Sequence, residues 1–69
     1  MPNTLIEDTT VRYAFSTLRE ARERALRGTR WLSDHGCNQI LMVRRATREV
    51  EIPSDVAEIW PGICDLMTE

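Results

Sequence analysis

The feature that most constrains the fold is a stretch from Leu18 to about His35, whose apolar residues recur at helical spacing and are nearly all small. Small side chains on one face let a helix backbone lie close to a sheet, and Gly28 costs about 1 kcal/mol of helix propensity unless such an approach offsets it. The sequence therefore predicts one long helix that covers a sheet. At 100° per residue, its core face collects Leu18, Ala21, Ala25, Gly28 and Leu32, with Thr29 beside them.

Both ends of this helix carry capping residues. Thr17, followed three residues later by Glu20, forms a capping box at the start. Gly36 follows the last periodic residue and supplies a left-handed C-terminal cap. The helix is therefore expected to end at about His35.

Strand patterns flank the helix. Residues Thr9–Phe15 alternate between apolar and other side chains, which predicts a half-buried strand. Ile40–Val43 and the alternating Glu49–Ile52 predict a β-hairpin whose turn is Arg45–Arg48. Because a strand that is apolar at four successive positions needs cover on both faces, Ile40–Val43 is predicted to be the inner strand. Pro53 ends the second strand.

The last segment has helical spacing up to Met67, and Ser54 and Asp55 are candidate caps at its start. Pro61 and Gly62 interrupt it, so either the helix kinks there or a short turn over 55–60 precedes a second helix that begins at Pro61.

The predicted element order is β-α-β-β-α, preceded by a lead-in over residues 1–8. An α+β fold is expected, a small two-layer sandwich in which one long helix and a C-terminal helical segment pack on a three-stranded sheet. The 69 residues allow one domain, 1–69, with a marginal core.

Charge is divided along the chain. All nine basic residues are arginine; residues 9–48 carry +6 and residues 49–69 carry −6. Two i, i+4 pairs, Glu20 with Arg24 and Glu23 with Arg27, are expected on the outer face of the helix. The acidic C-terminal third is expected to fold back on the arginine-rich helix, or alternatively to imitate phosphate toward a basic partner.

Several classes of function are excluded or disfavoured. No stretch is long and apolar enough to span a membrane and no export signal is present, so a cytoplasmic protein with reduced cysteines is expected. The spacing of His35, Cys37 and Cys64 matches no metal-binding loop, so no metal is expected, and no motif predicts a cofactor. Ser33-Asp34-His35 cannot form a relay, because successive helical residues point 100° apart. The chain is therefore not expected to be an enzyme.

Trp31 and Leu26 fall outside the core stripe, among the arginines of the helix. Trp and Arg are enriched at interface hot spots, so Trp31, Leu26 and Arg27 are candidate contacts for a larger protein partner. Alternatively, the C-terminal segment covers Trp31, or Trp31 stacks on Arg24 and Arg27. In general style the chain looks like the short accessory or anti-defence proteins of phages and mobile elements, a comparison of size and missing site motifs that suggests a small regulator or inhibitor.

Arg44, Arg45 and Arg48 crowd the predicted hairpin tip and complete the candidate partner-binding set. They also support an alternative, a nucleic-acid-binding module that combines the tip with the helix arginines. Against it stand the net charge of −2 and the low isoelectric point. A homodimer through strand 40–45 or the helix is a third prediction, compatible with the first.

Overall fold

The computed structural model describes residues 10–69 and shows an α+β fold with the element order β-α-β-β-α-α. This confirms the predicted class and the order of its first four elements. The predicted lead-in over residues 1–8 lies outside the described residues. The elements are β1 Thr10–Ala14, α1 Leu18–Asp34, β2 Met42–Arg44, β3 Glu49–Pro53, α2 Ser54–Ile59 and α3 Gly62–Thr68.

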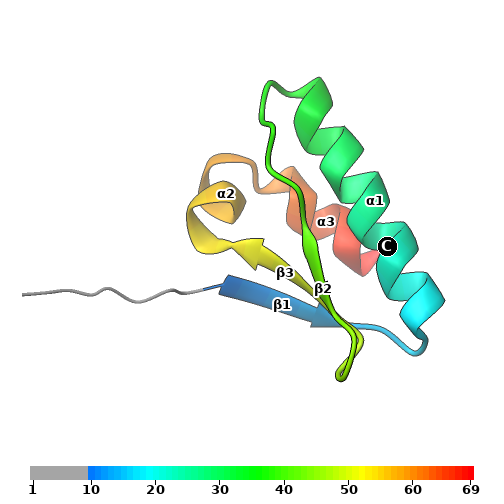
Figure 1. Cartoon of the computed structure of the whole chain (residues 1–69). Helices are drawn as coiled ribbons and strands as arrows, with labels where there is room; N and C mark the ends of the chain where they lie inside the picture. Colours follow the sequence, from blue (N-terminus) through cyan, green and yellow to red (C-terminus); the bar gives the residue numbers. More distant parts are fainter. Residues whose placement is uncertain (1–9) are drawn as a thin grey trace, which may run out of the picture.

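The sheet is antiparallel, and its strand order is β1-β3-β2 (Figure 1). The central strand β3 pairs with β1 through Tyr13↔Val50 and with β2 through Val43↔Val50. The prediction that the first hairpin strand is the inner one is wrong, since β2 is a three-residue edge strand. Residues 40–43 alternate between exposed and covered positions, so the apolar run has cover on one face only.

The helices cover one face of the sheet, and the core lies between the two layers. The other face carries charged side chains across all three strands: Glu51 lies between Arg12, at 3.4 Å, and Arg44. The strand alternation of β3 therefore sorts apolar residues inward and glutamates outward, as predicted. The fully or nearly fully buried core residues are Ala21, Ala25, Leu32, Leu41, Val50, Ile52, Val56, Ile63 and Met67.

The predicted features of α1 are confirmed. Thr17 Oγ1 accepts a hydrogen bond from the Glu20 backbone N–H at 3.1 Å, and Gly36 follows the helix with φ of 89°. Gly28 is buried, and a Cβ atom there would lie 2.6 Å from Leu41 Cδ1 and 3.0 Å from Met67 Cε. Close approach to Leu41, which precedes β2, and to α3 therefore accounts for a glycine within a helix.

The C-terminal segment forms two helices, which is the second of the two predicted alternatives. Pro61 is the N-cap of α3 and not its first helical residue. The prediction that Ser54 or Asp55 caps α2 is wrong, because the helix begins at Ser54 itself, its N-cap is Pro53 and no side chain makes a capping hydrogen bond. Asp55 Oδ1 instead accepts from the N–H of its neighbour Val56 at 2.8 Å.

Candidate functional site

An open groove separates α1 from the segment that leads into β2. One wall is the exposed side of α1, and the other is the apolar run before and within the edge strand. Arg22 is the only charged residue of the lining, so the groove floor is apolar and its rim is basic. The lining residues are Arg22, Ala25, Leu26, Thr29, Ile40, Leu41 and Val43.

Large apolar side chains gather around this groove. Among residues 10–69, four large hydrophobic residues are exposed: Leu26 (62%), Ile40 (66%), Met42 (64%) and Ile59 (65%). Leu26 and Ile40 line the groove, and Met42 lies on the same edge but opposite Glu51, on the outer face of the sheet. Isolated exposed apolar residues are common, but a cluster beside an apolar groove is typical of an interaction surface. We call Leu26, Ile40 and Met42 the apolar edge cluster.

Thr29 links the groove wall to α1 through hydrogen bonds of its hydroxyl group. Its Oγ1 accepts a hydrogen bond from the Leu41 backbone N–H at 3.1 Å and donates to the Ala25 carbonyl at 2.8 Å. The threonine thereby satisfies a backbone donor that precedes the edge strand. Sequence reasoning placed Thr29 beside the core face but did not predict this contact, because it depends on the path of residues 37–41.

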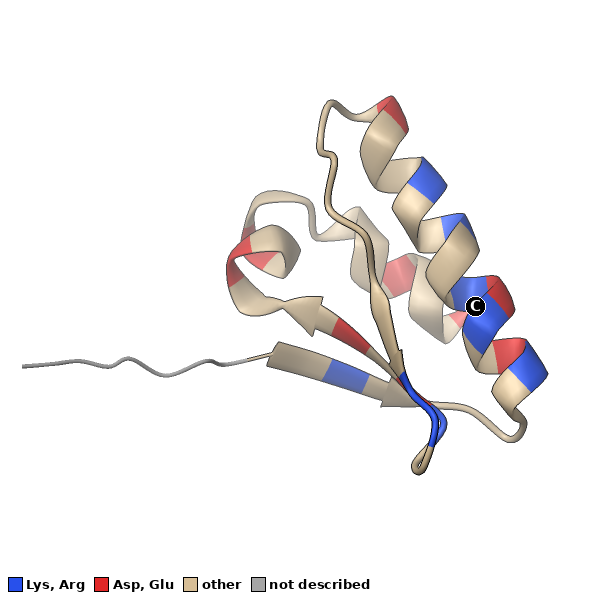
Figure 2. Cartoon of the chain, in the orientation of Figure 1, with Lys and Arg blue, Asp and Glu red and all other residues tan. Residues whose placement is uncertain are grey.

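Arginines form a stripe on α1 beside the groove. Arg19, Arg22 and Arg30 are exposed and share the helix face of Leu26, at positions i−7, i−4 and i+4. None of the three has an ion-pair partner within residues 10–69. Figure 2 shows basic and acidic residues along α1 and basic ones at the hairpin, whereas α2 carries acidic ones. The groove side of α1 therefore presents three arginines without an ion pair within residues 10–69, beside the exposed Glu23.

The remaining α1 arginines turn toward α3, so the expected i, i+4 pairs with Glu20 and Glu23 are not formed. Arg24 donates to the carbonyls of Leu66 and Met67 at 3.0 and 2.9 Å. Arg27 lies 3.8 Å from the Glu69 carboxylate. A cation at the last carbonyls of a helix is stabilised by the helix dipole, and these contacts direct Arg24 away from Glu20. The acidic C-terminal third thus folds back on α1 in part, through its last residues.

Two of the three hairpin-tip arginines have partners within the fold. Arg44 pairs with Glu51, whose hydrogen bond and negative charge raise the pKa of Arg44. Arg48 Nε donates to the Phe15 carbonyl at 3.2 Å. Arg45 is exposed and has no partner within residues 10–69. The tip therefore offers one free guanidinium where the sequence suggested three.

Trp31 lies on the other side of α1 from the groove, against α3. A Cβ atom at Gly62 would meet the Trp31 ring at 2.7 Å, and the ring stacks on His35 with 3.9 Å between centroids. This is the alternative in which the C-terminal segment covers Trp31, achieved through Gly62. Leu26 and Trp31 are therefore not parts of one surface.

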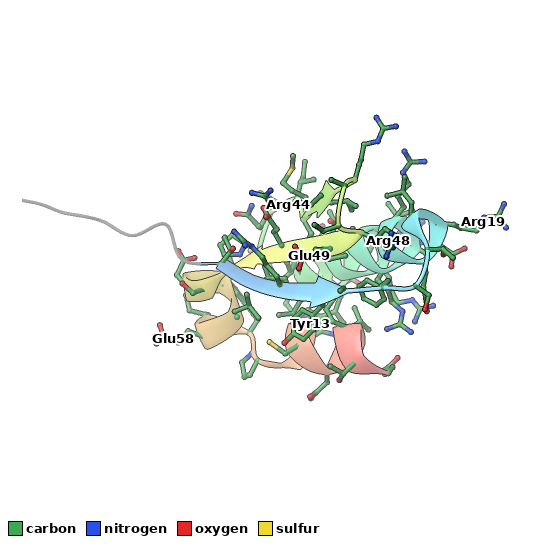
Figure 3. All side chains as sticks on the ribbon, turned by 90° about the horizontal axis from the view of Figure 1, so that it is seen from below. Tyr13, Arg19, Arg44, Arg48, Glu49 and Glu58 are labelled. Atoms are coloured by element: carbon green, nitrogen blue, oxygen red, sulfur yellow. The ribbon has the colours of Figure 1, made fainter. Side chains whose placement is uncertain are left out.

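Tyr13 and Cys64 form the titratable contact between the sheet and α3. Figure 3 shows Tyr13 directed from β1 toward α3. Its side-chain hydrogen bond with Cys64, burial, and the negative charges of Cys64 and Asp65 raise the pKa of Tyr13 to about 12. A phenol that holds its proton this firmly is a poor general acid at neutral pH, so this contact is best explained as packing.

Other reactive groups do not converge. Cys37 and Cys64 are free thiols. His35 Nδ1 lies 2.8 Å from the Trp31 carbonyl one turn back, away from any relay with Ser33 and Asp34. Within residues 10–69, no three His, Cys, Asp or Glu side chains are grouped as in a metal site. In the same range, no helix has the length and apolar content needed to cross a bilayer.

Ile40 and Met42 are the residues of this surface that sequence reasoning missed. The prediction that residues 40–43 form a strand covered on both faces implies that Ile40 and Met42 are buried, whereas both are exposed. Comparison of the chain with protein-family models, with curated proteins and with solved structures gives no match. The case for a function therefore depends on the groove itself.

Proposed function

We propose that this protein is a non-enzymatic protein–protein interaction module, a small regulator or inhibitor that binds a larger protein through the α1–β2 groove. The observation that carries the proposal is the apolar edge cluster of Leu26, Ile40 and Met42 beside a groove whose rim arginines are unpaired. Met and Arg are enriched at protein interfaces, and contiguous exposed apolar side chains mark interaction sites.

Charge complementarity defines the partner. The basic rim favours an acidic segment with apolar side chains that fill the groove. A second copy of this chain fits less well, because a two-fold interface would bring the Arg19, Arg22 and Arg30 stripe of one copy against the same stripe of the other. Nucleic acid would use the hairpin tip together with the helix arginines, and at the tip Arg44 and Arg48 already have protein partners.

The test is affinity capture from a bacterial lysate, with and without nuclease, using wild-type chain and two charge-matched variants. Leu26→Asp places a carboxylate in the groove, whereas Ile59→Asp changes an equally exposed apolar residue on α2. We expect stoichiometric partners with wild type and Ile59→Asp in both arms and their loss with Leu26→Asp. Equal retention by both variants contradicts the proposal, and loss of all retention after nuclease favours the nucleic-acid alternative.

A further inference from the structure

The backbone at the edge of β2 has an orientation that follows from the register. The Phe15 N–H donates to the Arg48 carbonyl at 3.0 Å, so the trans peptide between Arg48 and Glu49 directs its carbonyl toward β1 and the Glu49 N–H toward β2. Directions alternate along an antiparallel strand, which means that Val50 also faces β1 and that Glu49 and Glu51 face β2. Val43 lies opposite Val50 and therefore directs its own N–H and carbonyl away from β3, toward the open side.

The neighbouring backbone supports this orientation. Leu41 has the same parity as Val43, and its N–H indeed leaves the sheet to reach Thr29 Oγ1. No hydrogen bond joins the Val43 backbone to any group outside the sheet within residues 10–69. Unpaired groups on a sheet edge are a template for another strand. Val43 is thus an open position directly beside the groove.

We infer that the partner segment binds as an added β-strand along β2, with an apolar side chain opposite Val43 and acidic side chains on either side. This inference rests on the proposed function and specifies its mode. A residue opposite Val43 points to the groove side, and its neighbours point to the outer face beside Met42 and Arg44. On that face the guanidiniums of Arg12 and Arg44 are matched by the carboxylates of Glu49 and Glu51. The unmatched charge at this edge is that of Arg45, which follows β2, is exposed and has no ion-pair partner within residues 10–69.

The chain itself contains a strand of this chemistry. β3 reads Glu-Val-Glu-Ile-Pro and pairs with the other side of β2, with its glutamates on the outer face. The probe is therefore acetyl-Glu-Val-Glu-Ile-Glu-amide. Two control peptides keep the length: one replaces the glutamates by lysine, and one has the same composition with its apolar residues adjacent and the alternation lost.

The first measurement is amide hydrogen exchange of the full chain, free and with each peptide at millimolar concentration. In the free chain the Val43 amide is expected to exchange faster than those of Leu41, Met42 and Arg44. The acidic alternating peptide is expected to slow exchange at Val43, and the two control peptides are not. An unchanged Val43 rate with the acidic peptide overturns strand addition.

The second measurement compares Val43→Pro with Val43→Ala, because both replace the branched side chain and only proline removes the N–H. Proline is tolerated on an edge strand when its N–H faces solvent. We expect Val43→Pro to bind the peptide about tenfold more weakly than Val43→Ala. Equal binding overturns the inference; if Leu26→Asp still abolishes capture of the protein partner, the proposed function stands without strand addition, and if it does not, both fail.

Discussion

The two sides of α1 differ in how far the fold uses their side chains. Toward α3, Gly28 and Trp31 fit closely against their neighbours, and Arg24 is held by main-chain carbonyls. Toward β2, there is again an apolar residue, Leu26, and an arginine, Arg22, but both line an open groove. One helix therefore carries apolar and arginine side chains in two roles, and what separates the roles is whether a neighbouring element supplies partners.

The largest expected effect is on the closed side. Gly28→Val puts side-chain atoms where Leu41, Met67 and Ile63 already lie, so we expect a loss of about 3 kcal/mol in the free energy of unfolding. Urea denaturation followed by circular dichroism measures it, with the exposed Arg30→Val as control. If Gly28→Val is as stable as Arg30→Val, close packing at Gly28 does not distinguish the two sides of α1.

Arg24→Ala is expected to cost about 2 kcal/mol, because three main-chain oxygens of residues 66–69 lose a charged donor and Phe15 loses a cation 5.5 Å from its ring centroid. Thermal unfolding measures the change. Arg22→Ala, on the open side, is the matched control and is expected to be neutral. Equal effects would mean that the two sides of α1 use arginine alike.

Thr29 belongs to both sides, and Thr29→Val is expected to cost about 1.5 kcal/mol because the Leu41 N–H is left without an acceptor. Thr29→Ser keeps the hydroxyl and should recover most of this loss. Unfolding by urea and exchange of the Leu41 amide are the two readouts. If Val and Ser variants behave alike, the hydroxyl does not hold the groove wall.

The contact of Tyr13 with α3 makes the stability depend on pH only above pH 10. Its pKa of about 12 in the fold exceeds the ordinary value of 10.0, so the folded state keeps a proton that the unfolded chain releases. Stability is therefore complete below pH 10 and falls as pH rises toward 12. Tyr13 is the single tyrosine, so absorbance titration reports it alone. Cys64→Ala should lower the midpoint; an unchanged midpoint would assign the shift to burial.

The smallest expected effect is on the open side. Ile40→Ser should change the free energy of unfolding by less than about 0.5 kcal/mol, because the side chain is 66% exposed. The adjacent Leu41→Ser is the contrast, since Leu41 is 5% exposed and its loss opens the core. A strongly destabilised Ile40→Ser would show that the groove wall contributes to the core and is not a free surface.

Local signals predicted most of the fold. The cap at Thr17, the turn glycine at Gly36 and the small-residue stripe each depend on neighbours within one helical turn, and each is confirmed. The prediction that Ile40–Val43 is the inner strand is wrong, because four apolar residues in a row look alike whether one or both faces are covered. What decides the central strand is pairing on both sides of Val50, which is a long-range property.

The candidate surface was predictable only in part. Leu26 stood out because it breaks the helical stripe, and the structure places it on the groove. Trp31 breaks the stripe in the same way but is covered by Gly62. This glycine lies forty residues after Arg22, the first residue of α1 that lines the groove. Helical spacing shows which face a residue occupies, whereas the element that covers this face is chosen by the rest of the chain.

The hydrogen bond from Leu41 to Thr29 has a consequence for recognition. The Leu41 N–H is already bound to Thr29 Oγ1, so an added strand can pair with β2 only from Val43 onward. A slip of one residue would turn acidic side chains into the apolar groove. The Thr29 hydrogen bond thus fixes the register of an added strand. A partner sequence is therefore selected by which of its alternating positions are apolar, as well as by its composition.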